Sequence, residues 1–172
     1  SRLLLARFTT AACEDASDRD TSSALTFAAS LALSTLNDRE QAEGLIARAL
    51  ALDPSDRAVE VLDEVAESRV SAAAIASRAA ETAEDVRARQ RLLAFAYDRW
   101  LENGQLDDAS RALEARYELA PHDATIEQAF ALDLERRGEA PRLVGLLERQ
   151  LIRLREGEAR THLARRVATL RS

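Results

Sequence analysis

Residues 98–123 read DRWLENGQLDDASRALEARYELAPHD, and they contain the two breaks that decide the fold. Apolar residues recur at helical spacing on both sides of Asn103-Gly104, and Pro121 follows the second of these stretches. Glycine and proline interrupt helices, so the pattern predicts two short helices joined by a tight turn. The stretch ends in His122-Asp123, a residue pair that could instead bind a metal. The same residues can therefore be interpreted either as a break between helices or as part of a metal site.

The composition of the 172-residue chain favours helix throughout. The chain has five Gly, three Pro and 4% aromatic residues, and it is rich in Ala, Leu, Glu and Arg. These four residue types have high helix propensity, whereas strands are built mainly from β-branched and aromatic residues. All 24 basic residues are Arg, which indicates a biased genomic composition. We therefore predict an all-α fold.

Two long apolar stripes have the spacing of an amphipathic helix. The first consists of Leu25, Ala28, Ala29, Ala32, Leu33 and Leu36, and the second of Ala42, Leu45, Ile46, Ala49 and Leu50. Similar stripes continue along the chain and predict about ten helices joined by turns of about two to four residues. Such short turns make consecutive helices antiparallel neighbours.

The breaks between helices are periodic. Gly104 and Gly138 are 34 residues apart, and 67 residues separate Pro54 from Pro121, as they do Asn37 from Gly104. A period near 34 with two helices per period is typical of helical repeat arrays.

A motif recurs with these breaks. Ala42-x3-Ile46 precedes Pro54 with the same offsets as Ala109-x3-Leu113 before Pro121. A small residue lets two helices approach closely, a large one fills the adjacent space, and proline prevents the helix from continuing.

On these residues the chain resembles the tetratricopeptide repeat family. The best match is 90–123, with family positions occupied by Leu93, Ala96, Tyr97, Trp100, Gly104, Ala109, Leu113 and Pro121. The resemblance implies a right-handed superhelical solenoid of antiparallel helix pairs. It divides a single domain, 1–172, into repeats 23–56, 57–89, 90–123 and 124–156, with partial repeats 1–20 and 157–172. The family binds extended peptides or helices on a concave surface lined by the first helix of each pair. By helical phase, we expect a groove formed by Phe27, Leu31, Val61, Val65, Arg91, Asp98, Leu101, Glu102, Gln128, Glu135 and Arg136.

The candidates for chemistry have simpler structural interpretations. His122-Asp123 lacks further ligands because the only other histidine is His162, so we expect Asp123 to cap a helix beginning near Ala124. Cys13 has no histidine near it in sequence and is expected to be a buried thiol. Trp100 is expected to pack between helices. Carboxylate pairs such as Glu84-Asp85 and Asp107-Asp108 stand where helices begin or end. We expect no enzyme, no metal and no cofactor.

Charge is distributed unevenly. The net charge is -6, made up of -12 from residues 1–135 and +6 from residues 136–172. Five arginines could form a basic surface for RNA, acidic lipid or an acidic protein: Arg142, Arg149, Arg153, Arg160 and Arg166. Strong leucine stripes in the same segments favour the interpretation that these arginines are the solvated faces of packed helices. Without lysine or interleaved aromatic residues, nucleic acid is the least favoured partner.

We therefore predict a non-catalytic scaffold that binds a peptide or helix of a partner protein. An accessory or regulatory domain of a larger enzyme or sensor, and a self-assembling structural module, are the alternatives. Self-association is expected through the end segments, which carry Leu3, Leu4, Leu5 and Phe8 at one end and Leu163, Val167 and Leu170 at the other. No run of apolar residues is long enough to span a membrane. The cytoplasm is the expected compartment, with the periplasm left open.

Overall fold

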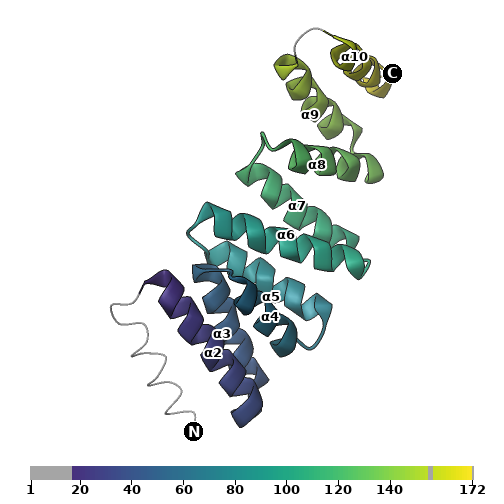
Figure 1. The fold of residues 1–172 in the computed structure, drawn as a ribbon. Helices are drawn as coiled ribbons and strands as arrows, with labels where there is room; N and C mark the ends of the chain where they lie inside the picture. The colour runs from purple at the N-terminus through teal and green to yellow at the C-terminus, as the bar shows by residue number, and fades with distance from the viewer. Residues whose placement is uncertain (1–16, 155–156, 172) are drawn as a thin grey trace. The chain divides into compact units, whose positions relative to one another are not determined.

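The computed structural model describes residues 17–154 and 157–171, which form nine α-helices and no strand (Figure 1). The helices are α2 (Asp18–Leu36), α3 (Arg39–Leu52), α4 (Asp56–Val65), α5 (Arg69–Thr82), α6 (Val86–Glu102), α7 (Leu106–Leu119), α8 (Ala124–Arg136), α9 (Ala140–Arg153) and α10 (Glu158–Arg171). The all-α prediction is confirmed for these residues. The additional helix expected within 1–20 lies almost entirely outside them.

The chain divides into two compact units, Ser1–Leu119 and Ala120–Ser172. The described part of the first contains α2 to α7, and that of the second contains α8 to α10. Helices α2 to α9 follow the four expected repeats two by two in chain order, although α2 and α6 each begin before the expected start of their repeat. The expectation that consecutive helices are neighbours is wrong for α4 and α5, which barely contact each other. The grouping of all repeats into one domain stays a prediction.

Capping residues define where the helices begin. The N-cap side chains of six helices accept a hydrogen bond from a backbone N–H two or three residues further on: Ser17, Asp38, Ser55, Ser68, Asp85 and Asp123. Such bonds satisfy backbone donors that lack a partner within the helix. Every one of these caps is a Ser or an Asp that the local sequence supplies directly before a helical stripe.

The periodic breaks adopt a recurring backbone conformation. Gly104 and Gly138 both have φ of 70°, and Asn37 has φ of 49°. After each glycine the next residue closes the turn: the N–H of Gln105 donates to the carbonyl of Trp100, and that of Glu139 to the carbonyl of Leu134, both at 2.9 Å. This left-handed ending is a common way to stop a helix and turn the chain back. The breaks predicted from the period are therefore confirmed.

The connection between α4 and α5 is different. Ala66 and Ser68 both have extended backbone conformations, and no residue of this connection is left-handed. Helix α5 makes little contact with α4 and packs extensively along α6. The end of α4 is instead held by α3, because Arg39 donates to the carbonyl of Val65.

Alanine dominates the interior of the first unit. The second stripe predicted from sequence is confirmed as buried, since Ala42, Ile46, Ala49 and Leu50 are each 0% exposed. The repeat-motif residues Ala109 and Leu113 are also 0% exposed. Small side chains at these positions let the axes of neighbouring helices come close together, so that the helices can pack tightly.

The second unit has a leucine-rich core. It is formed by Ile126, Phe130, Ala131, Leu134, Leu143, Val144, Leu146, Leu147 and Val167. Val167 is buried, and Leu163 and Leu170 are half-buried, on a helix that packs against α9. Much of the stripe expected to be exposed at the C-terminal end is thus covered within the unit, because α9 supplies an apolar partner for it. Leu3, Leu4, Leu5 and Phe8 lie outside the described residues.

Candidate functional site

The residues of the opening motif have structural roles. The Asp123 carboxylate accepts from the N–H of Thr125 at 2.9 Å and of Ile126 at 3.1 Å, and α8 begins at Ala124 as predicted. His122 is exposed, and its Nδ1 accepts from Arg153 at 2.9 Å. Asp123 therefore caps the N-terminus of α8, and the His122-Asp123 pair marks the start of that helix.

The other candidates for chemistry also lie at structural positions. Asp85 caps α6, and Asp107 and Asp108 lie in the first turn of α7. Trp100 is only 9% exposed within the core of the first unit, which confirms its predicted packing role. Cys13 lies outside the described residues. Among those that are described, no three His, Cys, Asp or Glu side chains gather as a metal site, and none of the helices is long and apolar enough to cross a membrane.

The apolar half of the expected groove is divided between surface and core. Phe27 is 57% exposed on α2, and Leu31 is half-buried. Val61 and Val65 are 0% exposed and belong to the buried face of α4. These two valines are interior residues because α4 is only ten residues long and uses one apolar stripe, which faces the core.

The charged half in the first unit is largely paired within the chain. On α6, Arg91 lies 3.7 Å from Asp56 of α4, and Glu102 lies 3.0 Å from Arg69 of α5 and 3.1 Å from Arg99. Arg99 also contacts Asp63 of α4 at 2.9 Å. Asp98 and Leu101 are exposed. These ion pairs link α4 and α5 to α6.

The expected groove residues of the second unit are exposed and partly paired. Gln128 is exposed, Glu135 lies 2.7 Å from Arg166 of α10, and Arg136 pairs with Asp133. Asp133 is buried and also lies 3.1 Å from Arg137.

The C-terminal arginines mostly bind their own chain. Arg142 lies 2.9 Å from Glu139 and over the ring of Phe130, Arg153 pairs with the buried Glu127, and Arg160 donates to the carbonyl of Leu154. This pairing agrees with the interpretation that the arginines are the faces of packed helices. Much of the positive charge of residues 136–171 is therefore paired with nearby carboxylates.

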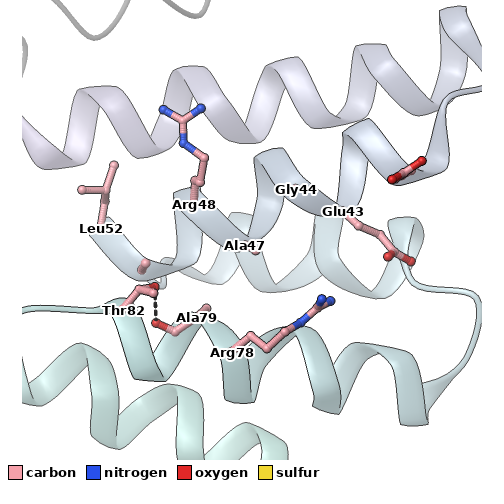
Figure 2. A pocket seen from close by; sticks show the side chains of 10 residues that line it. Glu43, Gly44, Ala47, Arg48, Leu52, Arg78, Ala79 and Thr82 are labelled. Carbon is pink, nitrogen blue, oxygen red and sulfur yellow. Dashed lines mark hydrogen bonds between the residues drawn. The ribbon is translucent and has the colours of Figure 1, made fainter.

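A groove lies between α3 and α5 in the first unit (Figure 2). Its volume is about 710 Å³. It is lined by Glu40, Glu43, Gly44, Ala47, Arg48, Ala51, Leu52, Arg78, Ala79 and Thr82, and we call it the α3–α5 groove. Small side chains make up its middle, whereas charged side chains stand on both helices. The groove therefore combines an apolar surface with fixed charges.

The two helices run in the same direction along this groove. Near their N-terminal ends, the Ser71 hydroxyl donates to the Glu43 carboxylate at 3.5 Å. Near their C-terminal ends, Leu52 and Thr82 line the groove together, and the Thr82 hydroxyl donates to the carbonyl of Ala79 at 3.1 Å (Figure 2). The N-terminal end of the groove is thus acidic, with Glu40 and Glu43. Arg48 stands further along α3, whereas the Arg78 side chain extends from α5 back toward Glu43 (Figure 2).

Three charged side chains of the α3–α5 groove lack partners within the described chain. Arg48, Arg78 and Glu40 form no hydrogen bond or ion pair there, unlike Arg89, Arg91 and Arg99 of α6. This groove was not predicted from the sequence, because the family resemblance assigns partner binding to the first helix of each pair. A signal was present in Gly44, Ala47 and Ala51, three small residues on one face of a helix.

A second, smaller hollow of about 360 Å³ lies on the same unit among α5, α6 and α7. Trp100 and Leu93 contribute apolar surface to it. Its charged lining residues include Asp108 and Arg111, which pair with each other at 3.1 Å, and Arg89, which donates to the carbonyl of Ala80. Its other two charged lining residues, Glu81 and Glu118, form no described ion pair.

Comparisons with known proteins add no relative: no protein-family model, curated protein or solved structure matches the chain.

Proposed function

We propose that this chain is a non-catalytic interaction module that binds a helix or peptide of a partner protein in the α3–α5 groove. The observation that carries the proposal is the combination of an open groove of about 710 Å³ with Arg48, Arg78 and Glu40 left without partners in the described chain. Among the described residues, most of the other arginines are bound to carboxylates or carbonyls of the chain. Charged side chains beside an apolar surface are suited to recognising a polypeptide segment. Burial of the segment's apolar side chains supplies affinity, and the charges supply selectivity.

We further propose that the first unit is a divergent tetratricopeptide-like array with the right-handed superhelical course of that family. Left-handed turns at Asn37 and Gly104, 67 residues apart, support this assignment. So do the contacts of α2 with α4 and of α3 with α5, which join equivalent helices of successive repeats. In such an array the α3–α5 groove lies between the second helices of two repeats, away from the surface lined by the first helices.

Site-specific photo-crosslinking tests the proposed function. A photoreactive phenylalanine analogue replaces Leu52 in the groove, Phe27 on α2, or Ile152 on α9 as an equally apolar, 81% exposed control. We expect crosslinked peptides of one partner protein, identified by mass spectrometry from the native source, at position 52 and not at position 152. Crosslinks at position 27 alone would transfer binding to the α2 face, and crosslinks at position 152 alone would reject both surfaces.

A further inference from the structure

We infer that the occupant of the α3–α5 groove is an amphipathic helix of about three turns that lies antiparallel to α3 and α5, with acidic residues in its N-terminal half and basic residues in its C-terminal half. The inference rests on the proposed function and specifies the partner's chemistry. It is carried by the length of the groove, by its small lining residues and by the order of its charges.

The length of the groove sets the length of the occupant. Lining residues run from Glu40 to Leu52 along α3. At 1.5 Å per residue this distance is about 18 Å, which about twelve helical residues span. A helix also satisfies its own backbone hydrogen bonds. An extended strand would need partners for its backbone groups, and the Ala and Gly residues in the middle of the groove cannot supply them.

Gly44 makes a close approach possible. It lies inside α3, where glycine is unfavourable relative to alanine, yet no atom lies within 4 Å of the position that its Cβ would occupy. The packing of the chain on itself therefore does not require glycine there. Gly44, Ala47 and Ala51 have small side chains, so the backbone of α3 is accessible along the groove. Side chains of a second helix can therefore approach this backbone closely.

The charges of the groove set the direction of the occupant. Glu40 and Glu43 stand at the N-terminal end of α3, and Arg48 lies nearer its C-terminal end, whereas the Arg78 side chain extends from α5 back toward Glu43 (Figure 2). An antiparallel helix would place acidic residues of its first half by Arg48 and basic residues of its last turns by the glutamates. That order also complements the helix's own dipole, whereas a parallel occupant would need the opposite order, which opposes it.

Selection from a displayed library of random 14-residue peptides tests the inference on the whole chain. Peptides are retained on the wild-type protein and depleted on Gly44→Leu, which fills the groove. If Gly44→Leu loses its helical circular dichroism, the Arg48→Glu, Arg78→Glu protein takes its place. We expect enriched peptides with apolar residues at a spacing of three and four, acidic residues first and basic residues last.

The outcomes separate this inference from the proposed function. Enriched peptides that lack helical spacing, or that carry basic residues first, would overturn the inference and leave peptide binding in the groove intact. If no peptide preferred the wild type over the filled groove, the proposed function would fall as well.

Fluorescence anisotropy of an enriched, labelled peptide then measures the contribution of the arginines. We expect Arg48→Glu, Arg78→Glu to weaken binding about tenfold or more, and a peptide with its acidic residues changed to Arg to recover affinity for that variant. The control, Arg19→Glu, Arg87→Glu, changes the net charge equally at residues outside the groove and should bind within about twofold of wild type. Equal losses in both double variants, or no recovery with the charge-swapped peptide, would overturn the inference.

Discussion

Two connections in the first unit each join consecutive helices and yet direct the chain differently. Between α6 and α7, Gly104 is left-handed and the N–H of Gln105 closes the turn on the carbonyl of Trp100. Between α4 and α5, Ala66 and Ser68 are extended, and the N–H of Glu67 has no backbone bond among those described. Helix α6 packs extensively on α7, whereas α4 barely contacts α5.

A left-handed residue reverses the chain within two or three residues. An extended connection does not by itself separate two helices, because α5 packs extensively on α6 although Ala83 and Asp85 are also extended. The conformation of a connection therefore does not alone decide which helices pair. The α4–α5 connection lies in the predicted repeat 57–89, which contains no proline.

The largest expected effect breaks the tight pair itself. Ala109 is 0% exposed on α7, so Ala109→Leu should overpack the α6–α7 pair and lower the free energy of unfolding by about 1 to 3 kcal/mol. Ala47→Leu is the matched control, because Ala47 lines the open α3–α5 groove and a larger side chain has space there. Urea titration followed by circular dichroism measures both. Equal losses in the two variants would show that α6 and α7 are not closely packed at Ala109.

The second prediction concerns the left-handed turn. Gly104→Ala should lower the free energy of unfolding by about 1 to 2 kcal/mol, because alanine at φ of 70° is strained. Gly44→Ala, inside α3 and with open space around its Cβ position, should instead raise it by up to about 1 kcal/mol through helix propensity. Thermal melts of the two variants must therefore move in opposite directions. A shift of the same sign in both would contradict the conformational difference between the two glycines.

The third prediction compares the two connections by removing one N–H from each. Gln105→Pro deletes the donor that closes the α6–α7 turn and should cost about 1 kcal/mol. Glu67→Pro deletes an N–H without a described backbone bond, in a segment that is already extended, together with an exposed carboxylate 3.9 Å from Arg39, and should change stability by no more than about 0.5 kcal/mol. Denaturant titration of both proteins measures the difference. A larger loss for Glu67→Pro would show that the extended connection also holds its helices in register.

The sequence was sufficient to predict the all-helical fold, the cap at Asp123 and the breaks at Asn37, Gly104 and Gly138. These features depend on residues close together in the chain, such as Asp123 before α8 and Gly104 after α6, and local physics determines them. The buried stripes were equally predictable, because Ala42, Ile46 and Leu50 follow the helical period on one face. Periodicity identifies a buried face in this way without identifying what covers it.

The binding surface could not be predicted in the same way. Val61 and Val65 were assigned to a groove by family phase, but the short α4 uses that face for the core. Whether an arginine is paired also depends on residues distant in sequence, as Arg91 with Asp56 shows, whereas Arg48 and Arg78 find no such partner among the described residues. Tertiary contacts alone distinguish these two groups of arginines.

The smallest expected effect concerns the connection that ends the opening stretch, where capping takes the place of a left-handed residue. Asp123→Ala removes both hydrogen bonds to the start of α8 and should cost about 1 kcal/mol, in contrast to His122→Ala, which should stay within about 0.5 kcal/mol of wild type. His122 is exposed, and its bond to Arg153 is replaceable because Arg153 also pairs with Glu127. Amide hydrogen exchange in the first turn of α8 measures both effects where they arise. A His122→Ala variant that opened this turn more than Asp123→Ala would show that the histidine, and not the cap, organises the connection.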